Sequence, residues 1–324
     1  MLTPPITPML ARARDVLPPA GQMPDALWQQ KIDGYRALAF IRSGALHLQS
    51  RGGANLAPAF PELVAAARGV RDDLVVDGEL VVFAGGRLDF AALQQRARRT
   101  GRGAAEAARE APAHFVAFDL LEADGEAWLS RPYGERWTRL EAAFATGVLR
   151  PPWTLVACTR DREVAAEWLD PAYGRVGVEG VVIKPASGLY RPGQRGWWKV
   201  RSFQSAEAVV AGVTGPVSAP HSLLLGRYDS AGRFRYVART TPLTAAARRE
   251  LGALLVPGGP EHPWADVRIS AGWGSREYLR FLPVRPELVV EVRTDSAVDQ
   301  GRHRHPVRYL RVRDDLTPHE VPAL

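Results

Sequence analysis

The sequence of 324 residues has very little lysine. Lysine occurs only at Lys31, Lys184 and Lys199, whereas there are 39 arginines. Arginine is not deprotonated in a protein and cannot act as an amine nucleophile, but a lysine amine can. Because arginine has taken nearly every other cationic position, we expect chemistry at the three lysines that remain. The alternative is the chance survival of three surface lysines.

Cysteine and long apolar runs are also scarce. The single cysteine, Cys158, excludes an intrachain disulfide and indicates a reducing cytoplasm, with a buried thiol as the simplest interpretation. No run of about 18 apolar residues is present, and the first residues lack the pattern of a secretion signal. We therefore expect a cytoplasmic protein without a membrane partner. Nothing in the sequence indicates an obligate dimer, so a monomer is expected.

The charge balance favours a polyanionic partner. The net charge is +7 and the sequence pI is about 9.9. A basic balance of this size is typical of proteins that bind nucleic acid, although many basic proteins do not. Hydrophobic residues make up 46% and charged residues 24%, which indicates a folded chain of roughly two domains.

The pattern of apolar residues predicts an α+β chain with domains at 1–202 and 203–324. In the first domain we expect antiparallel strands with flanking helices, after a loose lead-in at 1–24. Residues 100–112 are expected to be exposed and mobile. The predicted elements are a hairpin over 37–48, strands at 74–76, 80–83, 114–121, 180–184 and 197–201, and helices at 61–68, 90–99, 135–144 and 161–169.

The second domain has a different sequence pattern. Short strands separated by turns, with one helix, predict a small Greek-key barrel of the oligonucleotide-binding kind, an OB-fold. The predicted strands are 208–213, 222–228, 234–239, 287–293 and 307–312, and the helix is 244–255.

Five short segments of the first domain carry side chains suited to chemistry. Each alone is explained as well by ordinary structure, such as a salt-bridged hairpin, a tight turn or a core aromatic residue. Together they offer an amine nucleophile, carboxylates for a divalent cation or a ribose hydroxyl, a ring that can stack on a purine, and cations for phosphate. The segments are Lys31 to Arg36 (KIDGYR), Asp77 to Leu80 (DGEL), Phe115 to Leu121 (FVAFDLL), Glu179 to Lys184 (EGVVIK) and Trp197 to Arg201 (WWKVR).

In this order, the five segments resemble motifs I, III, IIIa, IV and V of the covalent nucleotidyltransferases, which comprise DNA ligases, RNA ligases and mRNA-capping enzymes. Four further segments resemble the bacterial ATP-dependent DNA ligases of the stand-alone ligase C type and the ligase domain of the end-joining ligase D. They are FPEL at Phe60, GRLDFAAL at Gly86, PELVVEV at Pro286 and GRHRHPVRYLRVRDDL at Gly301. The resemblance covers almost the whole chain. It implies a nucleotidyltransferase (adenylation) domain followed by an OB-fold domain.

The resemblance also implies a reaction. Lys31 would attack the α-phosphate of ATP, AMP would pass to the 5′-phosphate at a nick in duplex DNA, and the 3′-hydroxyl would displace AMP. Mg²⁺ or Mn²⁺ would assist, and DNA-repair or end-joining proteins are possible partners. The implied roles are catalysis for Asp33, Lys199 and Arg201; nucleotide or phosphate contact for Gln29, Arg36, Arg51, Glu79, Glu179, Lys184, Lys199 and Arg313; stacking on adenine for Phe118; and metal binding for Glu79 and Glu179.

The sequence departs from the family pattern at three positions. The family usually has an acid two residues before the nucleophile, which reads the adenine amino group, and here that residue is Gln29. Arg201 and Leu316 stand where many relatives have lysine. Two alternatives remain at this point, an RNA ligase or capping guanylyltransferase, and a non-catalytic OB-fold protein that binds nucleic acid. The ligase-like tail counts against capping, and the complete set of Lys31, Glu79, Glu179 and Lys199 counts against a pure binding protein.

Overall fold

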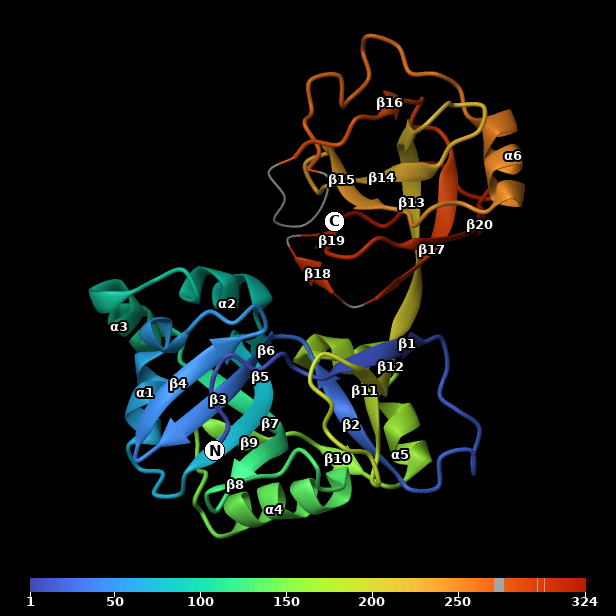
Figure 1. Ribbon diagram of the computed structural model, residues 1–324. Helices are drawn as coiled ribbons and strands as arrows, with labels where there is room; N and C mark the ends of the chain where they lie inside the picture. Colours follow the sequence, from blue (N-terminus) through green and yellow to red (C-terminus); the bar gives the residue numbers. More distant parts are fainter. Residues whose placement is uncertain (271–276, 296, 300) are drawn as a thin grey trace. The chain divides into compact units, whose positions relative to one another are not determined.

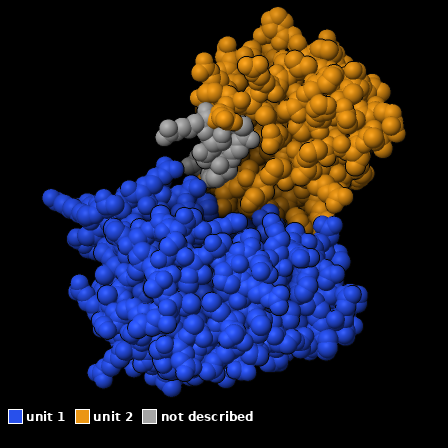
Figure 2. All heavy atoms as spheres, viewed as in Figure 1, with its two compact units in different colours: residues 1–202 blue, residues 203–324 orange. Residues whose placement is uncertain are grey.

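The chain folds into two compact units, residues 1–202 and residues 203–324 (Figure 2). The computed structural model describes residues 1–270, 277–295, 297–299 and 301–324. Figure 1 labels the helices and strands of both units. Each unit is treated below by itself.

Two sheets form the first unit (Figure 1). One has the order β4-β3-β5-β7-β8, with β6 paired to β5 and β9 to β7, and the other has the order β1-β12-β11-β2-β10. Most strand pairs are antiparallel, and β1–β12 and β7–β9 are parallel. The strands of the first sheet are β3 (Tyr35–Arg42), β4 (Ala45–Ser50), β5 (Leu74–Ala84), β6 (Arg87–Leu88), β7 (Ala113–Ala123), β8 (Glu126–Ala127) and β9 (Trp153–Leu155). Those of the second are β1 (Leu10–Arg14), β2 (Ala26–Ile32), β10 (Cys158–Thr159), β11 (Val178–Pro185) and β12 (Arg195–Arg201).

Helices cover the first sheet because its central strands are apolar on both faces. Strands β5 and β7 are buried along most of their length. Helix α4 buries Tyr133, Trp137 and Leu140 at helical spacing against β7, and the Arg136 side chain on the same helix forms a fully buried ion pair with Asp119 of β7. The helices are α1 (Pro61–Ala67), α2 (Phe90–Arg96), α3 (Gly101–Glu110), α4 (Tyr133–Ala145) and α5 (Arg162–Glu167), with 3₁₀ turns at Ala57–Ala59 and Pro171–Val176.

The described residues of the second unit form a six-stranded antiparallel sheet, a two-stranded sheet of β18 and β19, and one helix. The six-stranded sheet has the order β15-β14-β13-β17-β20, and β16 pairs with β13. Apolar residues of these strands, such as Val210 and Val290, pack with Leu251 of α6 in one core. The elements are β13 (Phe203–Thr214), β14 (Ser222–Tyr228), β15 (Phe234–Arg239), α6 (Ala245–Leu254), β16 (Leu282–Pro283), β17 (Val289–Asp295), β18 (Val298–Asp299), β19 (Arg302–His303) and β20 (Arg308–Val312).

Three local predictions were wrong. The lead-in contains β1, which pairs with β12 about 185 residues further along the chain, so no local pattern indicates it. The segment 100–112 is not loose, because α3 buries Ala104 and Ala107 and an exposed Arg102–Glu106 pair spans one turn.

The third correction concerns Asp77-Gly78-Glu79, which is not a turn between two strands but the middle of β5. A Cβ at Gly78 would lie 2.3 Å from the Phe115 ring and 2.7 Å from the Val116 carbonyl oxygen. Glycine is therefore needed here for the close approach of β7 and not for a turn. As a separate finding, none of the described helices is long and apolar enough to cross a membrane.

Candidate functional site

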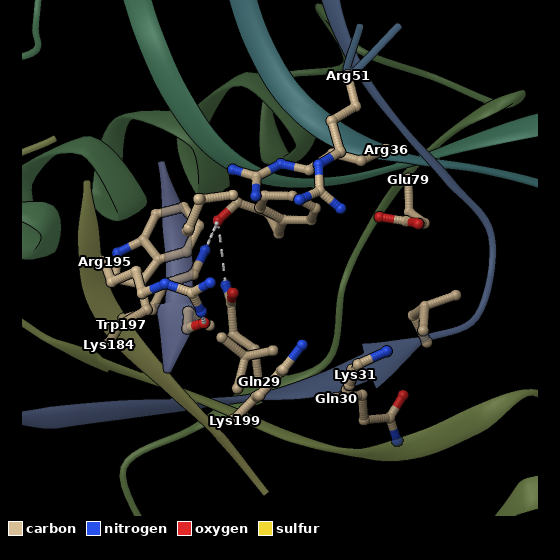
Figure 3. A pocket seen from close by; sticks show the side chains of 15 residues that line it. Gln29, Gln30, Lys31, Arg36, Arg51, Glu79, Lys184, Arg195, Trp197 and Lys199 are labelled. Carbon is tan, nitrogen blue, oxygen red and sulfur yellow. Dashed lines mark hydrogen bonds between the residues drawn. The ribbon is translucent and has the colours of Figure 1, made fainter. Parts of the chain in front are cut away.

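A cavity of about 300 Å³ lies between the two sheets of the first unit (Figure 3). Its walls come from β1, β2, β11 and β12 of one sheet and from β3, β5 and β7 of the other, together with Arg51. All three lysines of the chain line this cavity, although Lys31 and Lys199 are 168 positions apart in the sequence. A concave site with a few converging charged groups is the usual form of a ligand pocket.

The nucleophile proposed from the sequence lies at one end of this cavity. Lys31 stands near the end of β2, and its Nζ donates to the carboxylate of Glu179 on β11. Lys199, on β12, also lines the cavity, and its pKa is lowered by burial and by the positive charges of Arg201 and Lys31. The three strands thus bring two amines, a guanidinium and a carboxylate together.

Two motif glycines allow the strands to approach this closely. A Cβ on Gly34, just after β2, would lie 2.2 Å from the Leu80 carbonyl oxygen. Gly180, next to Glu179, has φ +141° and a Cβ there would lie 2.1 Å from the Val200 carbonyl oxygen. A side chain at either position would push the strands apart and separate the charged groups.

Arg36 is held rigidly at the opposite wall. Its guanidinium makes two hydrogen bonds to Asp77, with Nε–Oδ1 at 3.0 Å and Nη2–Oδ2 at 2.7 Å. Asp77 also accepts from the Tyr190 hydroxyl at 2.8 Å. The guanidinium carbon lies 5.2 Å from the Trp197 ring centre and 5.4 Å from that of Phe118. Two-point bonding and ring contacts fix the orientation of Arg36 before any ligand arrives.

The third lysine is enclosed by aromatic rings. Lys184 Nζ donates to the Phe118 carbonyl oxygen at 2.8 Å and lies 4.2 to 4.7 Å from the ring centres of Trp197, Phe118 and Tyr133. Burial lowers the pKa of Lys184 to about 7, although Asp119 and Asp77 oppose the shift. Phe118 and Val182 are only half-buried, while both of their neighbours along each strand are buried, so their side chains form the apolar part of the wall. This end of the cavity suits a flat ring.

Glu79 is a buried carboxyl group on the wall of the cavity. Burial raises its pKa to about 8, although Lys31 and Arg36 lie close enough for their charges to oppose the shift. In the described part of the chain, no three His, Cys, Asp or Glu side chains are grouped to hold a metal ion. Mg²⁺ commonly uses one or two carboxylates together with substrate phosphates, and Glu79 and Glu179 fit that arrangement.

The structure brings most of the predicted site residues together. Asp33, Glu179 and Arg201 do not line the cavity. The charges of Asp33 and Arg201 act on Glu79 and Lys199 respectively, and Glu179 accepts from Lys31. Arg313 lies in the second unit, where it bonds to Asp315 at 2.8 Å and to Glu207 at 2.9 Å, and its nucleotide role stays a prediction. The predicted residues that line the cavity are Gln29, Lys31, Arg36, Arg51, Glu79, Phe118, Lys184 and Lys199.

Other wall residues were missed by sequence reasoning. Arg195 and Val182 line the cavity, and Trp197 adds an aromatic face beside the two cations of its motif. Trp197 and Val182 had a usable signal, since they stand two positions before Lys199 and Lys184 and therefore share their strand faces. Lys184 was predicted to contact phosphate, and its partners here are a backbone carbonyl and three rings.

Comparison with known proteins identifies the family of the chain. Residues 8–201 match the family described as ATP dependent DNA ligase domain, and residues 218–316 match the ATP dependent DNA ligase C terminal region. DNA ligase C2 of Mycolicibacterium smegmatis is 35% identical over 96% of this chain and 91% of its own length. DNA ligase C of Mycobacterium tuberculosis is 34% identical over 97% of this chain and 92% of its own length. The chain belongs to the ATP-dependent DNA ligase family.

Solved structures give the same result for the fold. The ligase domain of LigD from M. tuberculosis is 28% identical, with a TM-score of 0.52 and 98% of each chain covered. A Lig E DNA ligase shares the fold at 18% identity and a TM-score of 0.54. The predicted family, the enzyme class of phosphodiester-forming ligases, and the fold class of an adenylation domain followed by an OB-fold domain are confirmed.

Proposed function

We propose that the chain seals 3′-hydroxyl/5′-phosphate nicks in duplex DNA through an AMP held covalently on Lys31. The observation that supports this proposal is that Lys31, Lys199 and Glu179 meet at one end of a cavity whose other end suits a purine. In the first step the Lys31 nitrogen forms a bond to the α-phosphorus of ATP, and the bond to pyrophosphate breaks. AMP then passes to the 5′-phosphate, and the 3′-hydroxyl displaces AMP to close the strand.

Lys31 has to lose a proton before this attack, because an ammonium has no lone pair. In the structure its Nζ donates to Glu179. A change of partner at Glu179 would leave the amine free to lose its proton to a base, as an amine nucleophile must. Lys199 and Arg201 would then stabilise the charge that develops on the phosphate. Asp33, Arg36 and Arg51 are proposed to act on the nick or the nucleotide, as their motif positions imply.

A divalent cation, Mg²⁺ or Mn²⁺, is proposed at Glu79 and Glu179. When bound, it would neutralise the charge on the triphosphate and on the pyrophosphate leaving group. Glu179 would exchange its Lys31 partner for this ion. The raised pKa of Glu79 is consistent with a carboxylate that needs a cation to become charged.

We further propose a monomeric, cytosolic enzyme acting in DNA repair. The net charge of +7, carried almost entirely by arginine, supports phosphate contacts with DNA. A 31% identical relative of M. tuberculosis is named a multifunctional non-homologous end joining DNA repair protein, LigD, and this chain matches 37% of its length. That similarity supports a role in end joining and makes end-joining proteins the partners to test first.

The test is a labelling and chase experiment. The protein is first treated with pyrophosphate and Mg²⁺ to remove AMP already bound, then desalted. It is incubated with α-labelled ATP and Mg²⁺ and run on a denaturing gel, and nicked DNA or nicked RNA is added to a second portion. We expect an acid-labile AMP label on the peptide that holds Lys31, and its transfer to nicked DNA.

Lys31→Arg is the matched control. It keeps the positive charge beside Glu179 but removes the amine that can be deprotonated, so the label should disappear while the circular dichroism spectrum stays the same. Transfer to nicked RNA in preference to DNA would replace the proposal with an RNA ligase, and preferential GMP labelling with a capping enzyme. No label on the stripped, folded protein would leave only a nucleic-acid-binding protein.

A further inference from the structure

The chain departs from its family's pattern at Gln29, where relatives have an acid. Gln29 is 1% exposed, lies on β2 and lines the cavity at the end that holds Phe118 and Lys184. A carboxylate offers a hydrogen-bond acceptor at both of its ends. An amide offers an acceptor at one end and a donor at the other, so its orientation decides which base edge it can read.

The contacts of Gln29 determine that orientation. Its Nε2 donates to the Tyr133 hydroxyl at 2.6 Å. The same nitrogen approaches the Phe118 carbonyl oxygen at 3.3 Å, which is drawn as a dashed line from Gln29 in Figure 3. The Tyr133 hydroxyl donates its single proton to the same carbonyl oxygen at 3.1 Å, so toward Gln29 it can only accept. Both neighbours of the amide nitrogen are therefore acceptors. The reversed amide would place two carbonyl oxygens 3.3 Å apart, which is unfavourable.

Tyr133 supplies the stronger of the two contacts. The Phe118 carbonyl oxygen is already taken by Lys184 at 2.8 Å and by Tyr133, so the 3.3 Å contact from Gln29 is the longest of three donors on one atom. The 2.6 Å contact to Tyr133 is unshared by any other donor that the structure describes. Removing the Tyr133 hydroxyl would take away the shortest of these contacts and leave the amide with the longer contact to the Phe118 carbonyl oxygen and its hydrogen bond to the Cys158 side chain.

We propose that Tyr133 determines which nucleotide this site accepts, by fixing the Gln29 amide with its oxygen available to the base. This inference rests on the proposed nucleotidyl transfer to Lys31. Adenine presents an amino donor at position 6, whereas guanine presents an oxygen acceptor there. An amide oxygen directed at that edge bonds adenine and repels guanine. Gln29 can then take the place of the family's acid, and Tyr133, a positioning residue that does not line the cavity, supplies the shortest contact that holds the amide in this orientation.

The experiment measures the ratio of AMP to GMP transferred to Lys31 when ATP and GTP compete at equal concentration, with intact mass distinguishing the adducts. The proteins are wild type, Tyr133→Phe, Gln29→Glu and the double variant, each stripped with pyrophosphate. Losing one hydrogen bond of this kind corresponds to about 1.4 kcal/mol, so Tyr133→Phe should lower the AMP:GMP ratio about tenfold. Gln29→Glu should keep a high ratio, and the double variant should regain it, because a carboxylate needs no orientation.

The matched control is Tyr190→Phe, which removes another buried hydroxyl that bonds to Asp77 and not to Gln29. Whatever its labelling rate, its AMP:GMP ratio should equal that of wild type. An unchanged ratio in folded, labelled Tyr133→Phe refutes the role of Tyr133 but not the proposed function. A double variant that stays unselective has the same consequence. Wild type that takes no label from either nucleotide refutes the proposed function itself. If Tyr133→Phe does not fold, Gln29→Leu gives the same test, since loss of the amide must also lower the ratio about tenfold.

Discussion

Lys184 offers a prediction that links burial, charge and pH. Its amine is 1% exposed, and burial lowers its pKa from 10.5 to about 7. Because the folded pKa is below the unfolded one, the unfolded chain binds the proton more tightly between these values. The contribution of Lys184 to stability is therefore complete above about pH 10.5 and is lost as the pH falls through 7. From pH 9 to pH 7 the loss is about 2 kcal/mol.

The perturbation is Lys184→Met, which keeps an unbranched chain among the Trp197, Phe118 and Tyr133 rings but cannot be charged. Urea unfolding of both proteins is followed at pH 7, 8 and 9 by tryptophan fluorescence. Seven of the nine tryptophans lie in residues 1–202, so the signal reports on that unit. The stability of wild type minus that of the variant should rise by about 2 kcal/mol from pH 7 to pH 9.

A second measurement reads the proton directly. The chain has only three lysines, so a spectrum of ¹³Cε-labelled lysine contains three resonances, and Lys184→Met identifies one of them. That resonance should titrate near pH 7. The argument from burial would fail if the stability difference between wild type and variant did not change with pH and the resonance titrated near the ordinary lysine value. The rings around Lys184 would then solvate the ammonium as well as water does.

Two further predictions concern how the first unit is held together. Gly78→Ala should lower the free energy of unfolding by about 1–3 kcal/mol, because its Cβ would meet the Phe115 ring at 2.3 Å. The control is Gly103→Ala in α3, which has open space around it and should be neutral or stabilise by up to about 1 kcal/mol. Equal thermal shifts in the two variants would contradict this. Arg136→Met should cost about 3–5 kcal/mol by leaving Asp119 charged and buried. Arg136→Met with Asp119→Asn should recover at least half of that loss in urea unfolding, and a double variant no better than the single one would rule out the ion-pair explanation.

Local patterns predicted those parts of the fold whose cause is local. The hairpin of β3 and β4 has short runs of apolar residues on both sides of Ser43-Gly44, and α6 follows the cap residue Thr244 and carries its own apolar face. Strand β1 could not be found in this way, because its partner β12 lies far away in the sequence. Helix α3 was missed because alanine and charged residues without large apolar side chains also describe an exposed loop.

For the site, the composition of the chain identified the important residues but not their environments. The scarcity of lysine selected Lys31, Lys184 and Lys199 without any structure, because arginine cannot replace an amine that must lose its proton. The sequence did not distinguish their environments. Lys31 is paired with Glu179, Lys199 is half-buried beside Arg201, and Lys184 is enclosed by rings, and each arrangement depends on strands from different parts of the chain.

Gln29 shows most clearly why a motif departure cannot be interpreted from the motif alone. The sequence identifies an amide where relatives have an acid, and that substitution by itself permits either orientation and hence either purine. The orientation is set by Tyr133, 104 positions away on α4, and by the Phe118 carbonyl, 89 positions away on β7. A tyrosine on an amphipathic helix is ordinarily a core residue, and nothing local separates it from one whose hydroxyl holds a base-reading amide. Selectivity for adenine in this chain is therefore a property of three contacts between distant segments, and it should change with Tyr133 while the nucleotide-binding motifs remain intact.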